Sequence, residues 1–149
     1  MNTTTAFEPR KRARRRALQA LYQWQLTGHG AGEILAQFRA AQDLSGVDEA
    51  HFERLLRGVV ADQQALDEAL QPFLDRPVAQ LDLMERAILR LGAFELLNCL
   101  ETPYRVVLDE CVDLAHRFGS TDGHSYVNAV LDKAARQWRG AELAPRPQA

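Results

Sequence analysis

The chain has 149 residues, of which 46% are hydrophobic and 26% are charged. This is the size and balance of one globular domain that can bury a core without disulfides or metal. Charged residues interrupt every apolar stretch, and the opening MNTTTAFEP has no apolar core, so neither a membrane span nor a secretory signal is predicted. We therefore expect a cytoplasmic protein.

The net charge of -2 hides a marked asymmetry along the chain. Residues 10–16 read RKRARRR and contain six basic side chains. Without these six, 12 of the 18 Lys and Arg remain against 20 Asp and Glu, a net charge near -8. A basic arm on an acidic body indicates a nucleic-acid partner.

Helical periodicity runs through the whole sequence, no segment alternates like a strand, and the predicted fold class is all-α. Asp48 is a plausible N-cap, and Thr102-Pro103 is a strong start signal for the helix that follows. The segment rich in Leu, Ile and Ala that follows Asp82 is apolar on every side, which predicts a central buried helix. Helices are expected over residues 10–28, 31–42, 48–60 (continuing or bending toward 73), 82–97, 103–118 and about 122–139.

On a helical wheel the basic residues of 10–16 cover about two-thirds of the circumference. A helix cannot point charge that widely into a core, so we expect its first two turns to project beyond the core and contact an anion. Six like charges at a helix start also oppose the macrodipole, at a cost in stability. The alternative is a solvated helix start or a targeting-like basic run.

On the same wheel Tyr22 falls between Lys11 and Arg15, a suitable place for stacking an RNA base, whereas Trp24 falls on the apolar side of the helix that faces the core.

Catalytic and metal-binding patterns are not found, so no enzyme, cofactor or metal is predicted. Cys99 and Cys111 form no CxxC or Cys/His cluster, and buried free thiols are the favoured interpretation. Asp122 and His124 lack a third ligand. Among other acidic residues, Glu95 lies on the apolar part of its helix, so we expect it to accept buried hydrogen bonds.

Three motifs follow one another in the chain: RARRRALQALYQWQLTG, MERAILRLGAFELL and FGSTDGHSYVNAVLDKAAR. Together they resemble the NusB family of bacterial transcription antitermination factors over about residues 10–136. The resemblance implies two small helical bundles, with about seven helices if the third segment breaks near Asp62. It also implies binding to boxA-type single-stranded leader RNA of ribosomal RNA operons with NusE, a small-subunit ribosomal protein, in an RNA polymerase elongation complex with other Nus factors.

The resemblance assigns roles by motif position. Glu85 matches a position near the NusE surface. Arg15 and Arg16 carry more charge than is familiar in the family, and Tyr126 replaces a familiar phenylalanine, a change that should preserve stacking. The implied RNA-binding residues are Arg10, Lys11, Arg12, Arg14, Arg15, Tyr22, Asp122 and Tyr126.

The expected organisation is a disordered segment 1–9, one helical RNA-binding domain at 10–139 and a flexible tail at 140–149. Two other functions stay open. The chain could be a detached NusB-like accessory domain of a ribosomal RNA methyltransferase, although it has no cofactor-binding domain. It could also be a homodimeric helical interaction module whose basic arm is incidental.

Overall fold

The computed structural model describes residues 3–41 and 44–143 of the chain. Within these ranges all regular structure is helical, as predicted, and none of the helices has the length and apolar character of a membrane span. The elements are α1 (Thr3–Thr27), α2 (Ala31–Ala41), α3 (Glu49–Ala61), α4 (Gln63–Leu70), η1 (Gln71–Phe73), η2 (Val78–Gln80), α5 (Leu83–Asn98), α6 (Tyr104–Phe118), α7 (Gly123–Trp138) and α8 (Gly140–Leu143).

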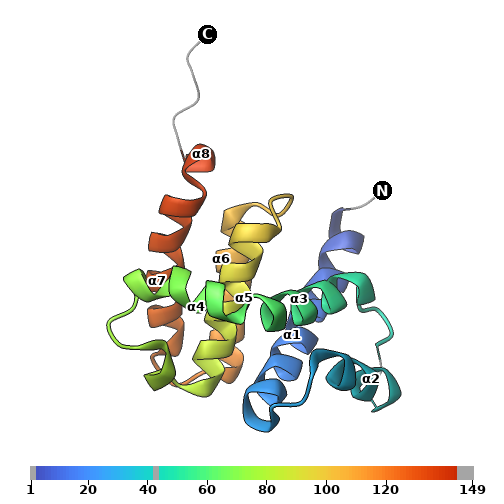
Figure 1. Ribbon diagram of the computed structural model, residues 1–149. Helices are drawn as coiled ribbons and strands as arrows, with labels where there is room; N and C mark the ends of the chain where they lie inside the picture. Colours follow the sequence, from blue (N-terminus) through green and yellow to red (C-terminus); the bar gives the residue numbers. More distant parts are fainter. Residues whose placement is uncertain (1–2, 42–43, 144–149) are drawn as a thin grey trace.

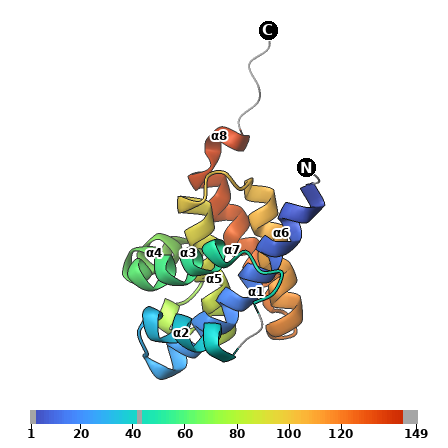
Figure 2. The ribbon, with the colours of Figure 1, turned by 90° about the vertical axis from the view of Figure 1, so that its right-hand side faces the viewer.

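The long helices form two groups around one continuous core. Helices α1, α2 and α3 pack against one another, and α5, α6 and α7 form the second group, with α4 against α5. Figure 1 shows α3 and α4 running one after the other across the longer helices, and Figure 2 shows α1 between α3 and α6. Helix α5 contacts both groups, and most of its residues are buried, so the prediction of a central helix is confirmed.

Local capping explains where several helices begin and end. The Asp48 carboxylate accepts from the His51 backbone N–H, which confirms it as the N-cap of α3. The third predicted segment breaks at Asp62, so α3 and α4 are separate helices. The Asp82 carboxylate accepts from the backbone N–H groups of Met84 and Glu85 and starts α5. Short polar side chains at these points satisfy N–H groups that have no partner within the helix.

The carbonyl groups at the end of α5 are satisfied by two arginines from distant parts of the chain. Buried Arg139, which follows α7, donates to the carbonyl oxygens of Glu95, Leu96, Cys99 and Thr102. Arg54 of α3 donates to the carbonyl of Asn98 at 2.9 Å. The last turn of the central helix is therefore held by both groups of helices.

Three predicted boundaries were wrong. Helix α1 begins at Thr3 rather than at Arg10, and residues 1 and 2 of the predicted disordered segment lie outside the described residues. The N-cap of α6 is Pro103 and not Thr102, whose hydroxyl accepts from Arg10 Nη1 at 3.4 Å. In the predicted flexible tail, residues 140–143 form α8, which follows Arg139, and residues 144–149 lie outside the described part.

Candidate nucleic-acid interface

One of the six cations of residues 10–16 points into the core. Arg14 is 2% exposed, and its guanidinium donates to both carboxylate oxygens of Glu95, at 2.7 and 3.0 Å. The predicted burial and hydrogen bonding of Glu95 are thereby confirmed. Its guanidinium is engaged by Glu95 and almost inaccessible, although Arg14 borders a groove beside the first turns of α1, so its assignment as an RNA contact stays a prediction.

Two further cations of the run are paired with carboxylates at the edge of the core. Lys11 Nζ lies 3.3 Å from Glu110 and 3.5 Å from Asp113, both on α6. Arg10 lies 3.6 Å from Asp48 and 3.9 Å from Glu101. Lys11 and Arg10 are both partly exposed, so each can still reach a second anion.

The expectation that the first turns of this helix project beyond the core was wrong. Ala13 and Ala17 are fully buried in those turns, and α1 packs along α3 and α5. The wide spread of charge is tolerated because carboxylates on other helices lie opposite the inward-pointing cations. Burying a charge is costly unless a hydrogen-bonded partner of opposite charge is present, and Glu95 and Glu110 supply that partner.

The remaining cations, Arg12, Arg15 and Arg16, form what we call the outward face of α1. At about 100° per residue they fall within roughly one-third of the circumference, together with Gln19 and Tyr22. Arg12 is exposed and its guanidinium lies against Gly46, whose φ is +78°. Arg15 and Arg16 are partly exposed, and Arg16 donates to Gln19 at 3.1 Å. Among the described residues, no carboxylate forms an ion pair with these three arginines.

Tyr22 lies on the same side of α1, two turns after Arg15, and is partly buried. Tyr22 therefore keeps part of its surface exposed on the side of α1 that carries these cations, as the helical wheel predicted. Trp24 is partly buried and packs against the core, with the Arg90 guanidinium carbon 5.6 Å from its ring centroid. A stacking role for Tyr22 stays a prediction.

The other predicted site residues surround a separate hollow of about 270 Å³ between α5 and the start of α7. The hydroxyl of Tyr126 donates to Asp75 at 2.9 Å, and the Arg76 guanidinium lies 5.6 Å from the centroid of its ring. Hydrogen bonds from Arg76 and Tyr126 lower the pKa of Asp75 to about 2. Asp122 is exposed at the N-cap of α7. Asp75 and Arg76 were missed, because only the fold brings their loop to Tyr126.

Glu85, which the resemblance places near the NusE surface, is largely buried rather than projecting from the central helix. It is 9% exposed, and its Oε1 accepts a 2.6 Å hydrogen bond from Ser120. Gly123 lies so close to that oxygen that any Cβ would collide with it. Glu85 therefore joins α5 to the turn between α6 and α7, and only a small part of it borders the hollow.

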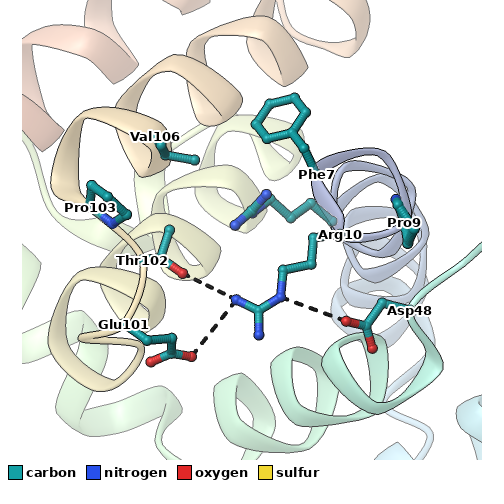
Figure 3. Close-up of a pocket in the computed structure, with 9 residues that line it drawn as sticks. Phe7, Pro9, Arg10, Asp48, Glu101, Thr102, Pro103 and Val106 are labelled. Carbon is teal, nitrogen blue, oxygen red and sulfur yellow. Dashed lines mark hydrogen bonds and ion pairs between the residues drawn. The ribbon is translucent and has the colours of Figure 1, made fainter. Parts of the chain in front are cut away.

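A larger groove, of about 810 Å³, opens beside the first turns of α1 and was not predicted. Figure 3 shows Phe7 and Pro9 on one side, Pro103 and Val106 on the other, and Arg10 between them. The groove was missed because its second wall comes from the loop before α6, more than 90 residues along the chain from Arg10. The apolar Phe7 beside the basic run was the only available signal.

The two cysteines are buried, as expected. Burial raises the pKa of the Cys99 thiol to about 11 and that of Cys111 further. Within the described ranges, His, Cys, Asp and Glu side chains form no group of three that could hold a metal ion.

Two groups of helices with a cationic helix face on the outside define a class: all-α bundles with the surface charge typical of nucleic-acid-binding proteins. Sequence comparison gives the family. The NusB family matches residues 11–136, and the chain belongs to it.

The curated relatives are similar over nearly their whole length. The transcription antitermination protein NusB of Nitrosococcus oceani is 54% identical over 137 residues, covering 92% of each chain. That of Alcanivorax borkumensis is 52% identical over 146 residues, covering 98% of this chain and 97% of the relative.

Solved structures agree with the fold. NusB of T. maritima superposes with a TM-score of 0.67 at 27% identity, over 87% of this chain and 92% of that one. A chain from a structure described as antitermination factors NusB and NusE in complex with dsRNA superposes with a TM-score of 0.74 at 25% identity, over 85% of this chain and 96% of that one.

Proposed function

We propose that this protein is a transcription antitermination factor that binds boxA-type leader RNA of ribosomal RNA operons together with NusE, and that it does so without catalysis. Curated relatives that are more than half identical are antitermination proteins, and a structural relative was solved with NusE and RNA. As part of the same proposal, the protein acts in an RNA polymerase elongation complex with other Nus factors and is cytoplasmic.

The main support for RNA binding is that only some cations of residues 10–16 have carboxylate partners within the fold. Arg10, Lys11 and Arg14 have carboxylate partners within the fold, whereas Arg12, Arg15 and Arg16 on the outward face of α1 have none among the described residues. Unneutralised cations on one helix face attract phosphates and release counterions when they bind them. Tyr22 on the same face would stack on a base.

The methyltransferase-domain alternative is not favoured, because the relatives matched over 82–97% of their length are antitermination proteins.

The hollow beside Glu85, Asp122 and Tyr126 is the proposed second contact region, for NusE or for RNA close to it. Charge complementarity supports this, since a ribosomal protein is typically basic.

The test of RNA binding is a salt titration with a single-stranded boxA-type RNA. Replacing Arg12, Arg15 and Arg16 by Ala should weaken binding and flatten the salt slope by about 0.7 for each phosphate that the variant no longer binds. The control replaces Arg105, Lys133 and Arg136, which carry the same total charge and are exposed on other helices, and should leave the slope unchanged. Equal slopes for both triple variants would contradict the proposed face.

A further inference from the structure

The groove beside the start of α1 combines apolar walls with a charged floor. Phe7, 41% exposed, forms part of one wall, and Pro103 and Val106 form the opposite wall (Figure 3). The volume of about 810 Å³ exceeds what one planar base needs, and the groove is open to solvent. An aromatic ring facing an apolar surface across such a gap is suited to a flat heterocycle.

The floor of the groove offers a cation and carboxylates side by side. Arg10 reaches Thr102 Oγ1 at 3.4 Å, whereas its separations from Asp48 and Glu101 are 3.6 and 3.9 Å. The two ion pairs are longer than a hydrogen bond, so Arg10 and these carboxylates keep hydrogen-bonding capacity for a third group.

Glu101 is the more accessible carboxylate of the floor, with its side chain 46% exposed. Its contacts with Arg10 and Arg54 both use Oε1. Hydrogen bonding by its own backbone, with further hydrogen bonding from Arg54, lowers its pKa, so it is an ionised acceptor at neutral pH.

Because these groups adjoin the basic run, and on the basis of the proposed RNA-binding function, we infer that the groove is a nucleobase pocket that prefers guanine. The base lies between Phe7 and the wall formed by Pro103 and Val106. Arg10 donates to its O6 and N7 acceptors, and the Glu101 carboxylate accepts from its N1–H and N2 amino group.

Guanine alone among the four RNA bases matches this arrangement fully. Its Watson–Crick edge carries two adjacent donors, which a carboxylate can accept together. Adenine and cytosine each place a ring-nitrogen acceptor there, which an ionised carboxylate repels. Uracil has one donor between two carbonyl acceptors, so it makes one bond where guanine makes two.

The groove is continuous with the outward face of α1. Phe7, Lys11 and Arg15 follow one another at four-residue spacing and therefore form one ridge along the helix. Lys11 Nζ lies 5.9 Å from the Phe7 ring centroid. A strand whose phosphates lie along Arg15 can thus place one base in the groove with Lys11 at the intervening phosphate.

The experiment measures binding of short labelled oligouridines that carry one central G, A or C in place of U, by fluorescence anisotropy at several salt concentrations. The unmodified protein should bind the G strand roughly tenfold more tightly than the A strand. Glu101→Gln should bring the G-to-A affinity ratio close to one, since an amide accepts with only one of its two ends. Glu53→Gln, at a carboxylate of α3 paired with Arg39 and Arg57, should keep the ratio.

A second variant guards against loss of structure. Phe7→Ala should weaken binding of the G strand about tenfold with an unchanged salt slope, because it removes stacking and no charge. The melting temperature of each variant is measured alongside, and Phe7, at an exposed edge, should alter it little.

The outcomes separate the two proposals. Absence of salt-dependent binding to every strand overturns the proposed RNA function. Salt-dependent binding with equal affinity for G, A and C strands overturns the guanine pocket alone. If Phe7→Ala binds all strands normally but loses affinity for NusE, the groove takes a protein segment, and the inference is again overturned.

Discussion

Arg14 donates two hydrogen bonds to Glu95, at 2.7 and 3.0 Å, in a pair whose side chains are 2% and 0% exposed. Burial acts to lower the pKa of Arg14, but hydrogen bonding and the charge of Glu95 outweigh it, and the pKa is raised. The basic run therefore has a structural role as well as a proposed RNA-binding role. The residues that perform the two roles are interspersed within residues 10–16, about two turns of α1.

The first prediction concerns this pair. Arg14→Met should destabilise the protein by about 3–5 kcal/mol, because it leaves the Glu95 carboxylate buried without its partner. Urea denaturation measures the change. Adding Glu95→Leu to the same protein should recover most of the stability. Arg12→Met, at an exposed position of the same helix, should change stability by less than about 0.5 kcal/mol. Equal losses of unfolding free energy for Arg12→Met and Arg14→Met would contradict the structural role of the Arg14–Glu95 pair.

A second prediction concerns pH. His51 is 3% exposed, its Nε2 lies 3.9 Å from Glu95, and that nitrogen has no hydrogen bond among the described residues. Burial lowers its pKa below the ordinary 6.5, although Glu95 and Asp48 act to raise it, and Arg10 and Arg14 add to the lowering. The folded protein therefore holds His51 neutral at pH 7, and the contact with Glu95 is not an ion pair there.

The direction of the change in stability with pH follows from proton binding at His51. Below pH 6.5 the unfolded chain binds a proton at this histidine that the folded protein does not bind, so stability falls as pH falls toward the lowered folded value. His51→Gln should flatten the decline in unfolding free energy between about pH 7 and 5. His29→Gln, at an exposed position, should leave the decline as it is. An identical decline in all three proteins would rule out this role for His51.

Two glycines give opposite predictions for the same substitution. A Cβ at Gly58 of α3 would collide with the Phe94 ring, so Gly58→Ala should cost about 1–3 kcal/mol. At Gly32 of α2 the nearest atom is Arg57 Nη1 at 4.0 Å, and Gly32→Ala should stabilise the protein by up to about 1 kcal/mol. Thermal unfolding of the two variants measures both. A destabilised Gly32→Ala would mean that the space beside α2 is filled.

The last prediction concerns Glu85 and NusE. Glu85→Lys would break the hydrogen bond from Ser120 in a buried place, so it should destabilise the fold by about 1–3 kcal/mol and cannot alone report on the partner. Glu85→Gln removes the charge but keeps an oxygen for Ser120, and should melt close to the parent.

Calorimetric titration with NusE then tests the carboxylate itself. If Glu85 contacts a basic partner group, Glu85→Gln should bind NusE about tenfold more weakly. Ser120→Ala is the control, because it removes the hydrogen bond to Glu85 without removing a charge. Its affinity for NusE should be closer to that of the parent protein than the affinity of Glu85→Gln. Unchanged affinity in Glu85→Gln would remove Glu85 from the proposed interface.

The helices were predictable because their signals are local. Asp48 and Asp82 cap the helices that follow them, and the apolar circumference of residues 83–96 identified the central helix. These features act within a few residues of one another, and the sequence records them directly. The resemblance supplied the two-bundle arrangement, which periodicity alone could not.

The carboxylate partner of each basic side chain in residues 10–16 could not be predicted from such local signals. Glu95 and Glu110 lie 81 and 99 residues beyond the basic residues they pair with, and helix periodicity carries no information over that distance. One signal was available. A carboxylate placed among apolar side chains on a buried helix needs a cation, and the basic run held more cations than a single outward face could present.

Arg139 reaches back to the end of α5 and donates to four carbonyl groups there. During synthesis, the central helix is therefore made well before the side chain that closes its last turn leaves the ribosome. Until then the carbonyls of Leu96 and Thr102 lack the Arg139 donor, whereas those of Glu95 and Cys99 already accept from the backbone N–H groups of Cys99 and Thr102. The final packing of the core thus waits for residue 139, although most of its apolar side chains are already available.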